Sequence, residues 1–188
     1  MEKEFSEYQV DEMSIILAGE ITAIPFGCVG TSEESLDVKN ISKKCKGVVT
    51  RSYTKQAGTG ELKITAHVPV DVYNKIYGMI NKKLKDNITS FGDASMPTFK
   101  IMQKVLDMDD QIKLKAYPNC TMKTGPARKI DATVEEIPEL EMTIALASDE
   151  NKQCMYEALI DQKKPEDLKL VTDWMTSFSY ELVKRENE

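Results

Sequence analysis

The stretch Gly60-Glu-Leu-Lys-Ile-Thr-Ala-His-Val-Pro69 carries the strongest structural signal in the chain. Its apolar residues Leu62, Ile64 and Ala66 alternate with polar ones. A period of two places successive side chains on opposite faces of a β-strand, so we predict a strand with one buried and one solvated face. Pro69 has no backbone N–H to continue a strand ladder and predicts the end of this strand.

Three further segments alternate in the same way, the one at residues 99–105 imperfectly, and each predicts a strand. Two of them flank an Asp-rich turn at residues 107–110 and predict a hairpin. Residues 48–54 favour a strand by composition, and the glycine-bearing residues 56–60 predict a hairpin connection to the strand that follows. The alternating apolar residues are Phe99, Ile101 and Val105; Ile112, Leu114 and Ala116; and Leu140, Met142, Ile144 and Leu146.

The N-terminal part of the chain has weaker patterning. Residues 1–12 are charged and lack an apolar period, which predicts an N-terminal arm ahead of a single domain of residues 13–188. Residues 13–18 predict a first strand. Glycine and proline in residues 19–40 predict a loop, with room for one short strand near residues 21–24.

Helices are predicted at few places. Asp71 can cap a short helix whose apolar residues form one stripe, and residues 150–160 predict a second helix. Residues 81–96 are polar and predict a long loop. Residues 168–182 fit either a helix or a strand, and their aromatic and threonine content favours a strand over residues 172–183.

These elements predict a mainly β (α+β) fold, an antiparallel β-sandwich or partly closed barrel with one or two short flanking helices. The length of 188 residues suits one domain with a genuine core. No apolar run reaches the length of a membrane span, and the charged N-terminus does not resemble a signal peptide, which predicts a protein made in a cytoplasm. Cysteines 28, 45, 120 and 154 form no C-x-x-C pair and are expected to be free thiols.

The residues offer little for chemistry. His67, the chain's one histidine, lies on the polar side of a predicted strand without a partner nearby in sequence, so a solvated surface residue is favoured over a general base. Asp107 is followed five positions later by Ile112, where a calcium loop requires glycine. Glu139 and Glu141 fall on the wet face of a strand. We therefore expect no catalytic residue, no metal ion and no cofactor, and we do not expect an enzyme.

Seven short segments between residue 60 and residue 184 carry a family resemblance. They are Gly60–Pro69, Val72-Tyr73-Asn-Lys-Ile-Tyr77-Gly78, Lys113-Leu-Lys-Ala-Tyr-Pro118, Thr124-Gly-Pro-Ala-Arg-Lys-Ile130, Glu135-Glu136-Ile137, Cys154-Met155-Tyr156-Glu157-Ala158-Leu159 and Trp174-Met-Thr-Ser-Phe178. In this order they resemble the major tail protein family, the tail tube subunits of long non-contractile-tailed bacteriophages. The resemblance covers about two thirds of the chain, and residues 1–46 carry little of it.

This resemblance implies a structural virion protein whose six copies close into a ring. Rings stack into the tail tube, which conducts the genome into the host. The implied partners are other copies of the chain, a tape measure protein, and the tail terminator and distal tail proteins. The implied location is the tail of a virion assembled in a bacterial cytoplasm. Related readings are a contractile-tail or type VI-like tube subunit or a tail terminator. More remote alternatives are a cytoplasmic ligand-binding β-domain, an enzyme or an adaptor.

The net charge of −6 does not favour nucleic-acid binding, because phosphate neutralisation needs clustered lysine and arginine. DNA is therefore expected to pass through such a tube without specific binding. We expect the wall of the bore to be acidic or neutral and to be formed by solvated faces of strands. The candidate bore-lining residues are Glu61, Lys63, Thr65 and His67 on one strand, and Glu139, Glu141 and Thr143 on another.

Overall fold

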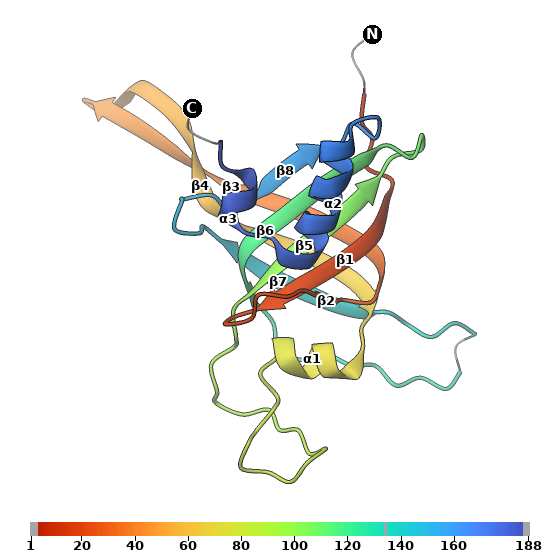
Figure 1. The fold of residues 1–188 in the computed structure, drawn as a ribbon. Coiled ribbons are helices and arrows are strands. Elements are labelled where there is room, and N and C mark those ends of the chain that lie inside the picture. Colours follow the sequence, from red (N-terminus) through yellow and green to blue (C-terminus); the bar gives the residue numbers. More distant parts are fainter. Residues whose placement is uncertain (1–3, 134, 186–188) are drawn as a thin grey trace.

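The computed structural model describes residues 4–133 and 135–185. It is mainly antiparallel β-sheet with three short helices (Figure 1). The strands are β1 (Gln9–Leu17), β2 (Ile24–Pro25), β3 (Cys28–Cys45), β4 (Val48–His67), β5 (Phe99–Leu106), β6 (Ile112–Met122), β7 (Leu140–Ala147) and β8 (Tyr156–Leu159). The helices are α1 (Val70–Ile76), α2 (Pro165–Ser177) and α3 (Tyr180–Val183).

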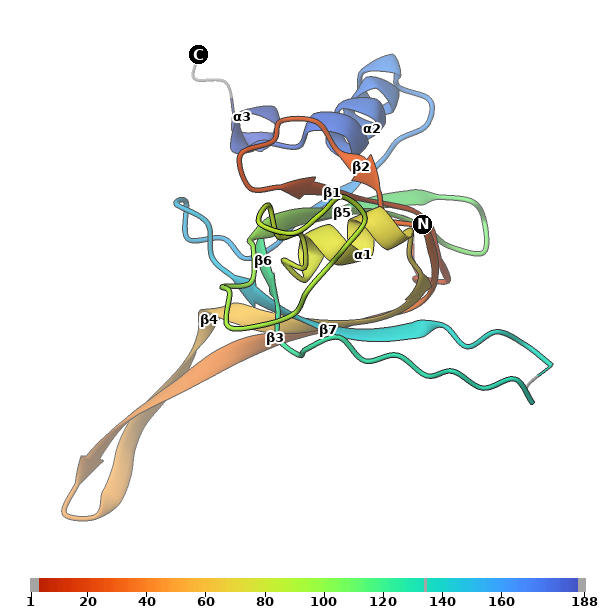
Figure 2. The same ribbon diagram turned by 90° about the horizontal axis from the view of Figure 1, so that it is seen from below.

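All eight strands belong to one sheet with the order β2-β1-β5-β6-β7-β4-β3, and β8 pairs with the other part of β6. The sheet curls so that its β1-β5-β6 half lies over its β7-β4-β3 half (Figure 2). The sheet does not close into a barrel. Instead, the side-chain amide of Gln103 on β5 donates a hydrogen bond to the Ser32 hydroxyl on β3 at 2.9 Å. The predicted mainly β fold with short flanking helices is confirmed.

The main core fills the space between the two halves of the sheet. Leu62, Ile64 and Ala66 point into it, as the alternation in the sequence predicts. Helix α1 covers one open end of this space (Figure 2), where Tyr73 and Ile76 are buried. A helix follows His67 as predicted, but Asp71 makes no capping hydrogen bond, because Pro69 occupies the position before the first turn.

A second core lies on the outer side of the β1-β5-β6 half, under α2 (Figures 1 and 2). Trp174 is buried there, and its indole N–H donates to the Lys115 carbonyl at 3.1 Å. The strand predicted over residues 172–183 is therefore wrong. The helical alternative holds because α2 places its apolar stripe on a sheet face that would otherwise be exposed.

The helix predicted over residues 150–160 is also wrong. Residues 156–159 form β8, whose backbone pairs with Lys113–Ala116 of β6. Without β8, the part of β6 that does not pair with β7 would leave its backbone groups unpaired at this edge. Satisfying those groups outweighs the local preference for a helix.

The largest difference between the predicted and the observed elements lies in residues 19–60. The loop predicted over residues 19–40 is replaced by β2 and the 18-residue strand β3, and β4 runs unbroken from residue 48 to residue 67. The hairpin turn lies at Lys46 and Gly47, both with positive φ. Gly58 is not in a turn: its φ of 73° allows an irregular step within β4, where a side chain would collide with Ser148.

Strand β1 already includes residues 9–12, which the sequence analysis assigned to the arm. Val10 pairs with Val105, and the Tyr8 amide extends the ladder to the Leu106 carbonyl at 3.0 Å. Residues 1–3 lie outside the described residues. The predicted loop of residues 81–96 is confirmed, apart from one isolated bridge between Ile80 and Thr89.

Candidate assembly surfaces

Within residues 4–133 and 135–185, no three His, Cys, Asp or Glu side chains are grouped to hold a metal ion. In the same residues no helix is long and apolar enough to cross a membrane. His67 is exposed at the end of β4, where it pairs with Cys28. Three regions of unusual charge stand out among the described residues.

The first region is the outer polar face of β3, β4 and β7. In the register of these strands, Lys63 lies opposite Thr143, and Thr65 lies opposite Glu141. The seven residues predicted to line a bore are thus brought onto one side of two paired strands, with Glu139 just before the start of β7. Strand β3, which sequence reasoning missed, adds Thr31, Glu33 and Ser35 to the same face.

Hydrogen bonds order part of the outer polar face. The hydroxyls of Thr31 and Thr65 lie 2.9 Å apart, and Thr65 also donates to the Glu139 carboxylate. This carboxylate lies directly over Gly30, where a Cβ atom would collide with it. A side chain at position 30 would therefore displace the Glu139 carboxylate from its place over the sheet.

The charge of the outer polar face is acidic on balance. Its carboxylates are Glu33, Glu61, Glu139 and Glu141, and its cations are Lys63 and the neighbouring Lys123. Lys123 pairs with Glu61. Among the described residues Lys63 has no carboxylate within 4 Å, so neither Glu61 nor Glu141 neutralises it directly.

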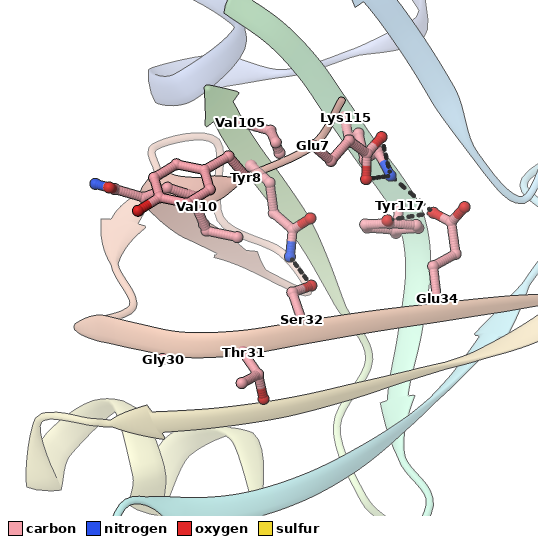
Figure 3. Close-up of a pocket in the computed structure, with 12 residues that line it drawn as sticks. Glu7, Tyr8, Val10, Gly30, Thr31, Ser32, Glu34, Val105, Lys115 and Tyr117 are labelled. Atoms are coloured by element: carbon pink, nitrogen blue, oxygen red, sulfur yellow. Dashed lines mark hydrogen bonds and ion pairs between the residues drawn. The ribbon is translucent and has the colours of Figure 1, made fainter. Parts of the chain in front are cut away.

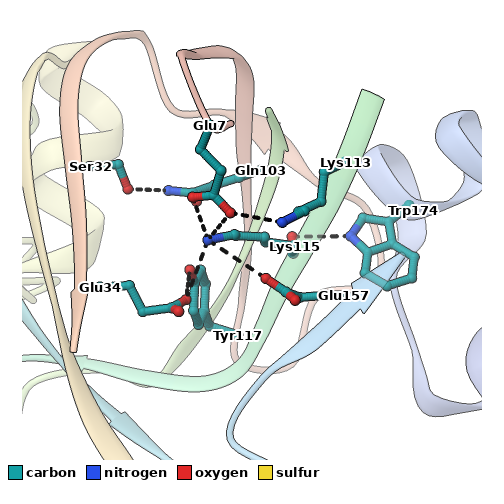
Figure 4. Close-up of polar contacts among 9 residues, drawn as sticks. All are labelled: Glu7, Ser32, Glu34, Gln103, Lys113, Lys115, Tyr117, Glu157 and Trp174. Carbon is teal, nitrogen blue, oxygen red and sulfur yellow. Dashed lines mark hydrogen bonds and ion pairs between the residues drawn. The ribbon is translucent and has the colours of Figure 1, made fainter. Parts of the chain in front are cut away.

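The second region is the Lys115 cluster, a group of charges formed by the buried Lys115 with Glu7, Glu34 and Glu157. It lies at the end of the curled sheet near the N-terminal arm (Figure 4). Lys115 is 6% exposed, and its ammonium lies 2.9 Å from Glu7 of the arm. Carboxylates of Glu34 on β3 and Glu157 on β8 lie 3.8 Å and 3.7 Å away. A buried ammonium needs such partners, because an isolated charge loses its hydration when buried. The cluster therefore joins four separate segments of the chain.

Tyr117 and Glu34 extend this cluster. The Tyr117 hydroxyl donates to the Glu34 carboxylate, and burial together with that negative charge raises the pKa of Tyr117. A cavity of about 260 Å³ lies beside them between β1 and β3 (Figure 3). Its polar groups already bond one another, as Gln103 does with Ser32. This arrangement suits a structural role, holding the segments together, rather than a reactive site.

Replacing Glu7 with glutamine tests the link between the arm and the sheet. Burial raises the pKa of Glu7, but hydrogen bonds and charges from Lys115 and Lys113 outweigh it and lower the pKa below 4.5. Because the folded pKa is depressed, the stabilisation is present above pH 4.5 and is lost as pH falls through the lower folded value. We expect Glu7→Gln to lower the free energy of unfolding by about 1 kcal/mol at pH 7.

Urea denaturation of both proteins from pH 7 down to acid measures this effect. The difference between wild type and Glu7→Gln should shrink towards zero in acid. The matched control is Glu20→Gln, at an exposed position. A difference that stays constant with pH would show that Glu7 acts through packing and not through its charge.

The third region is the basic ribbon, defined as residues 38–56, the outer part of the β3–β4 hairpin. It projects away from the body of the domain (Figure 2). It holds six lysines and arginines and no aspartate or glutamate: Lys39, Lys43, Lys44, Lys46, Arg51 and Lys55. Strand β7 pairs with β4 only at residues 59–66, so within the described part of the chain the ribbon is two-stranded. Six cations without a single carboxylate between them, in an acidic chain, were the sequence signal that could have marked this surface.

Cross-strand pairs in the basic ribbon are unfavourable for an isolated domain. Lys39 lies opposite Lys55, and Lys43 lies opposite Arg51. Like charges directly opposite one another destabilise a pair of strands. Between these pairs lie Ile41 and Tyr53, also opposite one another and both exposed. One side of the ribbon therefore holds four cations around an apolar pair, and this side is called the cationic strip.

No protein-family model and no curated protein matches the chain. Solved structures are similar to it over most of its length. A chain in the structure of the anti-feeding prophage cap, described as a tube terminating cap, has 15% identity over 84% of this chain and 96% of that chain, with a TM-score of 0.42. A chain of the anti-feeding prophage baseplate has 10% identity over 84% and 97%, with a TM-score of 0.43. A chain of the PVC sheath-tube complex, an extracellular contractile injection system in its extended state, has 14% identity over 82% and 94%, also with a TM-score of 0.43.

Proposed function

We propose that this chain is a structural subunit of a phage-type tail tube, and not an enzyme. Six copies form a ring, and the rings stack into a conduit for genome delivery. Its partners are its own copies, a tape measure protein inside the tube, and terminator and distal proteins at the two ends. Its place is the tail of the virion.

The observation that carries this proposal is the basic ribbon. A ribbon of two strands with both edges free gains little stability by itself. It also exposes Val48, Val49 and Tyr53, each more than half accessible to solvent. Exposed strand edges and exposed apolar residues together are typical of a surface that pairs with another chain. The domain has two complete cores without the ribbon, so the ribbon is available for assembly.

Within the tube, the outer polar face is the proposed wall of the bore. Its excess of carboxylates over lysines keeps anionic DNA from binding, because each free cation would hold a phosphate. Lys63 is the exception in this wall. Salt at physiological ionic strength screens its field beyond about 8 Å, and the carboxylates on the same face outnumber it.

The test is direct imaging of the purified full-length chain over a wide range of concentration. We expect a monomer or weakly associated form when dilute, and six-membered rings or tubes when concentrated. A reconstruction of the tube should place Glu61, Thr143 and Glu141 on the inner wall. A stable monomer or dimer at every concentration contradicts the proposal, and rings lined by another face contradict the assignment of the bore.

The same images separate the related candidates. Long polymers fit a tube subunit, whereas single rings that do not stack fit a terminator or a secretion-type ring. The resemblance in the sequence implies a non-contractile tail, whereas the similar PVC chain comes from a contractile injection system. A sheath bound around the tube in particles isolated from cells would instead establish the contractile-tail alternative.

A further inference from the structure

We propose that the cationic strip of the basic ribbon binds the acidic residues 135–138 of a second copy of this chain. The proposal rests on the function proposed above and names the two surfaces that join neighbouring subunits. Its partner is thus a peptide segment of defined chemistry: two adjacent carboxylates followed by one exposed isoleucine.

The charges of the two surfaces are complementary. The whole chain has a net charge of −6 and the basic ribbon alone carries +6, so the remainder of the chain carries −12. A basic projection on an acidic body repels the projections of other copies and attracts their bodies. The like-charge pairs Lys39–Lys55 and Lys43–Arg51 cost stability in the isolated chain. Carboxylates placed between them turn that cost into a gain on association.

The acidic segment offers carboxylates beside an exposed apolar side chain. Glu135 and Glu136 are adjacent, exposed and free of ion pairs among the described residues. Ile137 follows them with 77% of its surface exposed. The cationic strip offers a partner for each kind of group, with cations on either side of the apolar pair Ile41 and Tyr53. An exposed isoleucine can be buried against this pair while the carboxylates reach the flanking cations.

The positions of the two surfaces favour a contact between copies. The basic ribbon and the connection between β6 and β7 project from opposite sides of the domain in both views (Figures 1 and 2). One copy therefore cannot bind its own acidic segment. Two different surfaces at opposite sides make a head-to-tail contact, which repeats and closes into a ring or continues as a filament.

Complementary charge reversal tests the proposal in the full-length chain. One variant carries Lys43→Glu and Arg51→Glu, and the other carries Glu135→Lys and Glu136→Lys. Each variant alone should associate at least about tenfold more weakly than wild type, because every reversed side chain then meets a like charge at the contact. An equimolar mixture should recover association, since alternating copies restore opposite charges at both contacts. Sedimentation velocity over a concentration series measures all three samples.

Matched controls keep the charge and change the place. Lys82→Glu with Lys85→Glu, in the exposed loop of residues 81–96, changes the net charge as the first variant does. Glu20→Lys with Glu150→Lys matches the second. Both controls should associate within about threefold of wild type, because exposed charges outside a contact act weakly through screening salt. Circular dichroism confirms that each variant is folded.

The outcomes separate this inference from the proposed function. Wild-type association that neither variant weakens leaves a tube subunit in place and overturns the assigned contact. Weakening by both variants without recovery in the mixture overturns the pairing of the two surfaces. A wild-type chain that does not associate at any concentration overturns the proposed function and this inference together.

Discussion

Replacing Ile64 with aspartate should leave the chain unfolded. Ile64 is 1% exposed in the main core, and it lies opposite Met142 in the pairing of β4 with β7. A carboxylate at this position would be surrounded by apolar side chains and would lack any partner for its charge. The expected loss exceeds about 4 kcal/mol, a large part of the stability of a domain of this size. Circular dichroism and limited proteolysis should both report an unfolded chain.

Lys63→Asp is the matched control for Ile64→Asp. Lys63 is the adjacent residue, and its side chain points to the opposite, exposed side of the same strand. The same aspartate is expected to change the free energy of unfolding by no more than about 1 kcal/mol there. If both variants unfold, or if both remain folded, the register of β4 is wrong.

Trp174→Ala should have the second largest effect, through the other core. Trp174 is 1% exposed, and its ring packs against Phe178 with 4.7 Å between centroids. Truncating a buried tryptophan loses apolar burial and leaves a cavity, at a cost of about 3–5 kcal/mol. It also removes the indole N–H that satisfies the Lys115 carbonyl. Urea denaturation followed by far-ultraviolet circular dichroism measures the loss.

Leu168→Ala is the control on the same helix. Leu168 is 48% exposed, so its truncation should cost less than about 1 kcal/mol. If Trp174→Ala is equally mild, α2 does not cover a core. The sheet would then hold without the helix, and the C-terminal segment would be free for another role.

The strands that could be predicted from the sequence are those with one buried and one solvated face. Strand β7 and the inner part of β4 follow the simple alternation, because one face of each strand packs in the core and the other faces water. The outer polar face follows from the same rule, since an alternating strand defines both of its sides. Pairing with β7 then brings together residues that are about 80 positions apart, as with Thr65 and Glu141.

Sequence by itself determined the mainly β class and the buried positions Leu62, Ile64 and Ala66, because local alternation of polarity reports burial directly. Tertiary structure alone decided the segments whose own preference is weak or contradictory. Strand β8 exists because the edge of β6 needs backbone partners, and α2 is a helix because the outer face of β1, β5 and β6 needs cover. The basic ribbon is exposed on both faces and shows no alternation of burial to read. Its extended form comes from pairing between β3 and β4, and pairing between distant residues is not encoded in the local pattern of either strand.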